Sequence, residues 1–323
     1  MINKIQFSVV IPLYNKVESV CRTLESLCQQ RLLASEIIVV DDGSTDGSAE
    51  RVSALNLPNV RLVKQENKGV SFARNHGVSL AKYEHIAFID ADDQWSPFFL
   101  LEMRKLIERF PGYEFFASSY QKVCKNETYI DPKLAIGHIP PQGCVLDNYF
   151  DIVARGDLPF MVSSTVITRD LFTKLGGFPV GESMGEDQEL FSQVALKASI
   201  VYSPLILLKY HTDSENRACD RHLPDQPLPF ANRLLTLVET ELNEVSLKKS
   251  ISTYCAAHVC HLVKSNLRAG NLAIAKQLLQ HPCCKLKPLH FFSFKLWLLS
   301  KIMLSPRAYL TQVKRFSAYI HTQ

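Results

Sequence analysis

Four short apolar runs in the first hundred residues constrain the fold more than any other feature of the sequence. They read "FSVVIPLY" at 7–14, "EIIVVD" at 36–41, "NVRLVK" at 59–64 and "HIAFID" at 85–90. The segments between them have helical periodicity, with apolar residues three or four positions apart, as in "VESVCRTLESLC" at 17–28. Apolar strands that alternate with helices predict a parallel sheet covered by helices on both faces. The sequence therefore predicts a doubly wound α/β fold.

Polar side chains follow three of these strands directly: "YN" at 14–15, "DDGSTD" at 41–46 and "ADD" at 91–93. Ligands of such sheets bind beyond the carboxyl ends of the strands, so these clusters should share one crevice. Asp90, Asp92 and Asp93 would repel one another unless a cation compensates, and a hard divalent ion prefers oxygen ligands. The alternative is that these acids only cap a helix entered at 96–97.

The segment "NKGVSFARNHG" at 67–77 places a loop before a helix that contains Arg74. Lys68, Arg74 and the helix N-terminus would offset the charge of a phosphate group. An ordinary basic amphipathic helix is the alternative. Asp42 follows a wholly apolar strand, and its carboxylate could accept a hydrogen bond from the imide N–H of a base.

Four motifs, "SVVIPLYNK", "EIIVVDDGSTDGS", "NKGVSFARNHG" and "IAFIDADDQW", occur in an order and spacing that resemble the family 2 glycosyltransferases of the GT-A fold. The resemblance covers residues 5–100, continues more thinly through 163–178 and 185–197, and ends near 215. It implies a GT-A domain with a Rossmann-like, mostly parallel sheet. It also implies a nucleotide-sugar donor, most simply a UDP-sugar.

The resemblance and the charge argument together assign nucleotide-sugar binding to Pro12, Tyr14, Asn15, Asp42, Lys68, Arg74 and Asp90. In the family's pattern, Tyr14 stacks on the base, Asp42 binds its imide edge and Asp90 lies near the ribose. A cofactor of Mn²⁺ or Mg²⁺ is implied, with Asp92 of the DxD motif as a ligand and His211 as a second one.

Asp187, in "GEDQEL", matches the position where the family keeps its catalytic base. An inverting displacement follows, in which Asp187 takes the proton of an acceptor hydroxyl as its oxygen attacks the anomeric carbon. Glu186 would orient that base or bind the acceptor; a favourable charge at a helix N-terminus is the alternative.

The QxxRW motif of processive relatives is absent, so we expect transfer of a single hexosyl or N-acetylhexosaminyl group. The acceptor would be a glycan or a lipid-linked acceptor in bacterial surface polysaccharide synthesis. Two alternatives stay open: a transferase acting on polyprenyl phosphate, and a non-catalytic nucleotide-sugar binder or scaffold. Basic residues are not spread over the predicted catalytic face, so no nucleic-acid partner is expected.

Residues 1–215 are expected to form the GT-A domain and 216–323 a helical C-terminal region, with a helix junction at "RAGN", 268–271. From residue 281 onward the chain has seven Lys or Arg residues and no Asp or Glu. This basic, aromatic tail predicts either an anionic membrane surface bound through 285–315 or packing on the catalytic domain.

No apolar run reaches the ~18–20 residues that span a bilayer. The nine cysteines are an odd number without framework spacing, and no signal peptide opens the sequence. We expect a cytoplasmic protein, with peripheral attachment to the inner face of the plasma membrane as the variant of that expectation.

Overall fold

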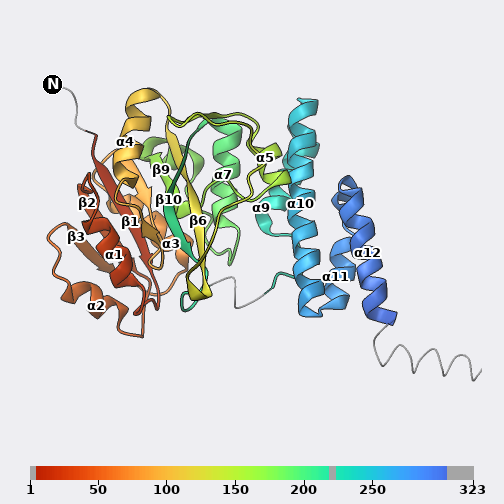
Figure 1. Cartoon of the computed structure of the whole chain (residues 1–323), viewed down its shortest axis with the longest axis horizontal. Coiled ribbons are helices and arrows are strands. Elements are labelled where there is room, and N and C mark those ends of the chain that lie inside the picture. The colour runs from red at the N-terminus through yellow and green to blue at the C-terminus, as the bar shows by residue number, and fades with distance from the viewer. Residues whose placement is uncertain (1–4, 218–222, 304–323) are drawn as a thin grey trace, which may run out of the picture. The chain divides into compact units, whose positions relative to one another are not determined.

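The computed structural model describes residues 5–217 and 223–303, with side chains up to residue 300. The chain divides into two compact units, Met1–Asp220 and Arg221–Gln323. Figure 1 shows that strands are confined to the first unit and that the second is built from helices.

One sheet organises the first unit. Its strands are β1 (Phe7–Leu13), β2 (Glu36–Asp41), β3 (Val60–Lys64), β4 (His85–Phe88), β5 (Gln94–Trp95), β6 (Phe115–Cys124), β7 (Thr128–Ile130), β8 (Cys144–Leu146), β9 (Thr165–Thr168) and β10 (Ile200–His211). The spatial order is β3-β2-β1-β4-β9-β6-β10-β5, with β7 paired to β6 and β8 to β10.

The first four strands pair as the sequence predicts. β1 runs parallel to β2 and β4, and β2 runs parallel to β3. Beyond β4 the sheet becomes mixed, because β9 is antiparallel to both β4 and β6 while β6 and β10 are parallel. The α/β prediction is confirmed, and the carboxyl ends of β1, β2 and β4 meet at one edge, as expected of parallel neighbours.

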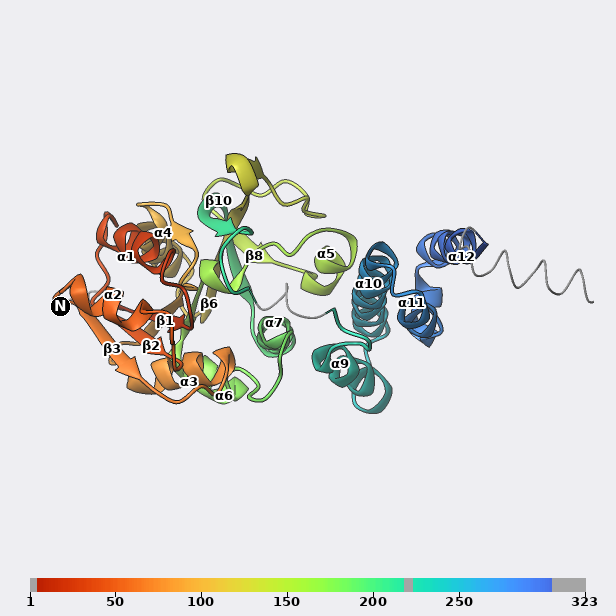
Figure 2. The ribbon, with the colours of Figure 1, turned by 90° about the horizontal axis from the view of Figure 1, so that it is seen from below.

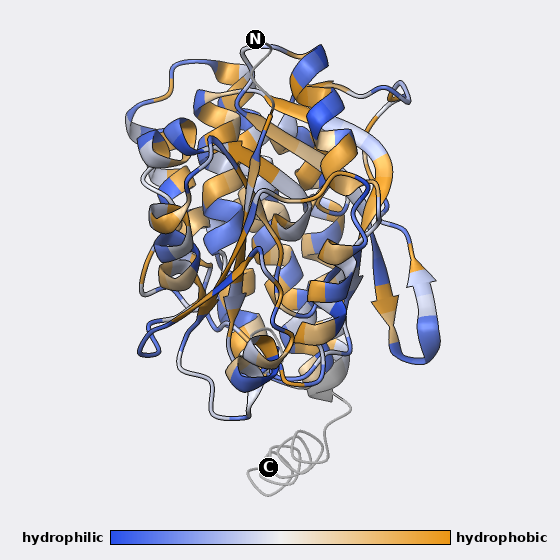
Figure 3. Ribbon diagram, turned by 90° about the vertical axis from the view of Figure 1, so that its left-hand side faces the viewer, coloured by the Kyte–Doolittle hydropathy of each residue, from blue (hydrophilic) through white to orange (hydrophobic). Residues whose placement is uncertain are grey.

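Helices cover both faces of the sheet. They are α1 (Val20–Cys28), α2 (Ser48–Ala54), α3 (Val70–Leu80), α4 (Phe99–Arg109), α5 (Tyr149–Arg155), α6 (Arg169–Leu175) and α7 (Glu186–Lys197), with short 3₁₀ turns η1 (Lys125–Glu127) and η2 (Val162–Ser164). In Figure 2, α1 and α4 lie on one face of the sheet, and α3, α6 and α7 lie on the other. Figure 3 shows hydrophobic and hydrophilic stretches alternating along the helices, as amphipathic helices require.

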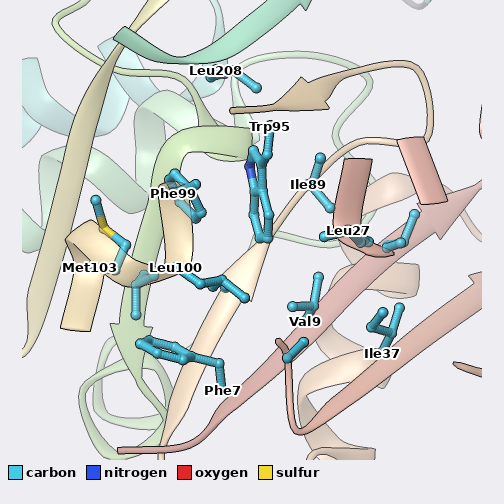
Figure 4. Packing of buried hydrophobic residues seen from close by; sticks show 14 of the residues in the cluster. Phe7, Val9, Leu27, Ile37, Ile89, Trp95, Phe99, Leu100, Met103 and Leu208 are labelled. Carbon is cyan, nitrogen blue, oxygen red and sulfur yellow. The ribbon is translucent and has the colours of Figure 1, made fainter. Parts of the chain in front are cut away.

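The core on the α1–α4 face is made by alternate residues of the strands. Phe7 and Val9 of β1 point into it, together with Trp95 and side chains of α4, as Figure 4 shows. The Trp95 indole stacks on Phe99 with ring centroids 4.1 Å apart. Every second residue of β1 is therefore available to the opposite face.

On that opposite face, α3 comes unusually close to β1. A Cβ atom at Gly77 would lie 2.4 Å from Cγ1 of Val10, a distance that no real side chain could tolerate. The missing side chain lets α3 pack against β1, and this fixes the helix that carries Arg74, one turn earlier.

The second unit contains α9 (Pro229–Thr240), α10 (Val245–Ala269), α11 (Leu272–Leu279), η3 (Pro282–Leu286) and α12 (Pro288–Met303). α10 ends at Ala269, and Gly270 follows it as the predicted cap, with a left-handed φ of 82°. The hydrophobic core of the second unit joins α10, α11, η3 and α12 through buried residues such as Val263, Leu278 and Phe294. Within the described ranges, no helix combines the length and the apolar character needed to cross a membrane.

Candidate active site

The turn after β4 carries the acidic cluster. The backbone N–H of Asp93 donates to the carbonyl of Asp90 at 3.1 Å, which closes the turn, and the N–H of Asp90 donates to Ser163 Oγ at 3.0 Å. The alternative role of these acids as helix caps is not found, because α4 begins at Phe99 without a side-chain capping hydrogen bond. Asp93 is completely buried, and burial, with the charges of Asp92 and Asp90, raises the pKa of its carboxyl well above the usual range.

Arg74 connects this turn to the start of α7. Its Nη2 lies 2.7 Å from Asp90 Oδ1 and its Nη1 lies 3.0 Å from Glu186 Oε1. The guanidinium is buried and stands 5.0 Å from the ring centroid of Phe178. Burial alone would lower the pKa of Arg74, but the two carboxylates raise it, so the group stays charged. Because Arg74 is buried in two ion pairs, α3 is not the ordinary basic amphipathic helix that was the alternative. Contact between Arg74 and a phosphate group stays a prediction.

Asp187 lies beside this ion-paired group, in the first turn of α7. Burial and the charge of Glu186 raise the pKa of the Asp187 carboxyl to about 7, although its Oδ1 accepts a hydrogen bond from the Gln188 N–H at 2.7 Å. A carboxylate whose pKa lies near neutrality is suited to general base catalysis.

Tyr149 of α5 is a site residue that sequence reasoning missed. Its buried hydroxyl has no hydrogen-bond partner among the residues that the structure describes. Burial raises the pKa of that hydroxyl well above its usual value, and the nearby charge of Asp187 raises it further. No motif marks Tyr149, because its place beside α7 depends on how the region between β8 and β9 folds.

Lys16 is a second residue that the motifs did not identify. Its Nζ lies 2.6 Å from Asp92 Oδ2, and the same oxygen accepts a hydrogen bond from Ser214 Oγ at 2.6 Å. Both ion-paired side chains are largely buried, 12% and 14% exposed. The only available signal was a basic residue directly after the strand-end "YN". A Lys ammonium therefore holds the carboxylate that the DxD resemblance assigns to a metal.

The segment that follows β10 is bound to the loop between β1 and α1. Lys16 Nζ also donates to the carbonyl of Glu215, and Glu215 Oε1 accepts from Ser19 Oγ at 2.8 Å at the start of α1. Asn216 Nδ2 donates to the carbonyl of Tyr14 at 3.0 Å. These contacts bring the far end of the sheet to the predicted base-binding residues.

The loops after β1 and β2 are tied together at the same edge. The Asn15 N–H donates to Ser44 Oγ at 3.0 Å, and Asn15 Oδ1 accepts from the Thr45 N–H at 2.8 Å. Pro12 lies buried within β1, while the half-buried Tyr14 follows that strand. All three positions therefore lie at the strand end where a base was predicted.

The Asp42 carboxylate fixes the loop before α3. It accepts hydrogen bonds of 2.8 Å from the Lys68 N–H, the Gly69 N–H and Gln65 Nε2. An ionised carboxylate has about four acceptor positions, so one remains for an imide N–H. The ammonium of Lys68 stands 4.9 Å from the ring centroid of Phe72.

His211 closes the group at the end of β10. Its backbone N–H donates to Asp93 Oδ1 at 3.2 Å, and its Nδ1 is 3.9 Å from Asp213 Oδ1. Nε2 is buried and has no hydrogen-bond partner within residues 5–217 and 223–300. Burial lowers the pKa of the imidazole, which favours the neutral, metal-ligating form.

Asp92 and His211 are the side chains at this edge that could bind a divalent cation. Among the described residues, no three His, Cys, Asp or Glu side chains form a ready metal cage. Mg²⁺ and Mn²⁺ at phosphate-transfer sites usually take only one or two protein ligands and complete their shell with phosphate and water. The orphaned His211 Nε2 and the Asp92 carboxylate fit this requirement, once Lys16 releases its oxygen.

Residues 8–145 match the model of glycosyl transferase family 2. The chain is similar to the uncharacterized glycosyltransferase YibD of Escherichia coli K12, with 47% identity over 94 residues, 28% of this chain and 27% of that protein. It is also similar to the amylovoran biosynthesis glycosyltransferase AmsB of Erwinia amylovora, with 41% identity over 116 residues, 33% of this chain and 38% of that protein.

A solved structure covers nearly the whole chain. Residues 1–349 of S. aureus TarS, in complex with UDP-GlcNAc, superpose with a TM-score of 0.63 at 16% identity, over 95% of this chain and 92% of that one. At this identity the likeness shows the GT-A-like fold. The chain spans about a third of the length of the two curated relatives. The likeness to glycosyl transferase family 2 therefore rests on residues 8–145, which match the model of that family.

Proposed function

We propose that the protein is a metal-dependent, inverting glycosyltransferase that moves one sugar from a nucleotide-sugar, a UDP-sugar, to an acceptor hydroxyl. One observation carries the proposal. The buried Arg74 guanidinium bridges Asp90, in the DxD turn, and Glu186, next to the candidate base Asp187. The residues for the donor and for proton removal are thereby held at one edge of the sheet.

In the proposed reaction, Asp187 accepts the proton of the acceptor hydroxyl while the hydroxyl oxygen forms a bond to the anomeric carbon. The bond from that carbon to the donor diphosphate breaks, and its electron pair leaves with the diphosphate. Asp187, with a pKa of about 7, is partly ionised at neutral pH and can receive the proton. Asp92 and His211 would hold Mn²⁺ or Mg²⁺, which supplies positive charge for the departing diphosphate.

For the donor, we propose that Tyr14 stacks on the base, that Asp42 uses its remaining acceptor position for the imide N–H, and that Asp90 lies near the ribose. The polar contacts that join Asn15 to the β2 loop would keep this base site rigid. The TarS structure holds UDP-GlcNAc, which supports a UDP-sugar of the hexosyl or N-acetylhexosaminyl class.

For the acceptor, we propose a hydroxyl of a glycan or of a lipid-linked glycan in bacterial polysaccharide synthesis. The name of AmsB refers to amylovoran biosynthesis, which supports this class. Action at the inner face of the plasma membrane is part of the same proposal. A purely non-catalytic binder is disfavoured, because Asp187 lies beside the Arg74 ion pairs rather than far from the donor residues.

The test is calorimetric titration of the full chain with UDP and UDP-sugars, with Mn²⁺ and with EDTA, on the wild type, Asp92→Ala and Asp187→Asn. We expect metal-dependent UDP binding that Asp92→Ala abolishes and Asp187→Asn retains, while sugar transfer or UDP-sugar hydrolysis is lost in both variants. Asp170→Asn, on the exposed surface of α6, is the matched control and should behave as the wild type. Absence of nucleotide binding with and without metal would overturn the proposal.

A further inference from the structure

Helix α12 has two apolar faces. One face packs into the core of the second unit, where Phe294 and Leu298 are each only 7% exposed. The other face carries large apolar side chains that solvent reaches, namely Leu289 at 84%, Phe292 at 62%, Leu296 at 69% and Leu299 at 49% exposure. Their spacing of three, four and three residues aligns them on one side of the helix. We call these four side chains the exposed stripe.

Exposure of these four apolar side chains to water is unfavourable in free energy. Helices that are hydrophobic on both faces are normally covered on both, and contiguous exposed apolar patches mark binding surfaces. Each of the four side chains would contribute about 1.5–3 kcal/mol if it were fully buried. The second unit therefore presents a surface whose natural environment is less polar than water.

The charges near the exposed stripe indicate what covers it. The charged residues within 282–300 are Lys285 of η3, Lys287 between η3 and α12, and Lys295 of α12. No Asp or Glu occurs from 281 to the end of the sequence. Lys295 lies 5.1 Å from the ring centroid of Phe291, which keeps its ammonium beside the apolar faces of the helix. Leucine and phenylalanine flanked by lysine is the composition of helices that lie in a membrane interface.

We propose that the exposed stripe of α12 binds the surface of an anionic lipid bilayer, with the helix lying in the plane of the interface. A helix of 16 residues is about 24 Å long, so the four side chains could enter the same depth of the bilayer together. The lysines would interact with anionic headgroups at about 1 kcal/mol each. The rest of the basic tail, residues 304–315, lies outside the described part of the chain.

A second copy of the chain fits the stripe less well. A symmetric pair of α12 helices would bring lysines of one sign together, with no acidic residue after 280 to pair with them. The stripe also runs only from Leu289 to Leu299, less than two heptads, whereas three or four heptads indicate a coiled coil.

The test is flotation of the full chain with vesicles, without nucleotide or metal, so that its outcome does not depend on the donor site. Vesicles of phosphatidylcholine alone are compared with vesicles that contain 30 mol%, roughly, of phosphatidylglycerol. The variant Phe292→Ser/Leu296→Ser removes the centre of the stripe. The matched control Leu33→Ser/Val245→Ser removes two apolar side chains of similar exposure, 61% and 79%, at other places on the surface.

We expect the wild type and the control to float with the anionic vesicles and to be released by salt, and the stripe variant to bind at least about tenfold more weakly. Circular dichroism checks that all forms retain their helices. Equal binding of the stripe variant, or no preference for the anionic vesicles, would overturn the proposal. So would a dimer of the wild type in light scattering that the stripe variant abolishes, because a second copy would then cover the stripe.

Discussion

Replacement of Arg74 by Met tests whether one guanidinium holds the candidate site together. Met keeps most of the volume of the Arg stem but removes both charged hydrogen bonds, to Asp90 at 2.7 Å and to Glu186 at 3.0 Å. Such bonds are worth about 1.5–3 kcal/mol each. Because Asp90 is 25% exposed and can take up a proton, we expect the lower end of the cost of breaking a buried pair, about 3 kcal/mol. For a unit of this size that lowers the unfolding midpoint by about 6–12 °C.

The assay is thermal unfolding followed by the fluorescence of Trp95, which is buried in the first unit, in a Trp297→Phe background that silences the second of the two tryptophans. Lys174→Met is the matched control, because the Lys174–Asp170 pair is as short, 2.6 Å, but exposed. It should leave the midpoint unchanged. Burial already raises the pKa of Asp90 and Arg74 opposes that rise, so removal of Arg74 raises it further.

A carboxyl with a raised pKa in the folded state costs stability as the pH rises, so the deficit of Arg74→Met should be larger at pH 8 than at pH 5.5. A midpoint that does not differ from the Lys174→Met control, or a deficit that shrinks toward high pH, would refute the reasoning.

Three further results are expected. The rate of transfer should rise with pH through about 7, because only the ionised Asp187 accepts a proton. Asp187→Asn should lower that rate by about 10²–10⁴-fold. A pH-independent rate in the wild type would contradict this role of Asp187. Lys16→Met should raise the affinity for Mn²⁺ by about tenfold or ~1.4 kcal/mol, because the ammonium that competes for Asp92 is removed. The affinity is measured by calorimetric titration without nucleotide. An unchanged affinity would mean that Lys16 does not compete with the metal. Gly77→Ala should lower the free energy of unfolding in urea by about 1–3 kcal/mol, because the added methyl group clashes with Val10. The control Gly137→Ala should leave it unchanged, since nothing lies within 4 Å of the added Cβ atom. Equal stabilities of the two variants would contradict the close packing of α3 on β1.

The parallel half of the sheet was predictable because its signals are local. Apolar runs such as "EIIVVD" end in Asp and Gly turns, and β2 (Glu36–Asp41) has the predicted bounds. Parallel pairing then fixes which strand ends meet, so the sequence alone predicts that Tyr14, Asp42 and Asp90 lie at one edge. The mixed half was not predictable in detail, because β9 enters between β4 and β6 from a distant part of the chain.

The partners of the charged residues were beyond sequence reasoning for the same reason. The ion pair of Arg74 with Glu186 and that of Lys16 with Asp92 join residues far apart in sequence, and periodicity does not specify such pairs. The sequence describes the basic, aromatic tail only as a whole. The structure separates its aromatic side chains into two sets, since Phe294 packs in the core while Phe292 stays exposed.

The bridge made by Arg74 has a consequence for protein engineering. Its two carboxylates stand at positions 90 and 186, so the segment between them begins and ends on the same side chain. A cassette that spans 96–185 could be exchanged with the same segment of a relative. Asp90 before the cassette and Glu186 after it would both still pair with Arg74. The exchange would leave Arg74 and both of its acidic partners in the recipient chain.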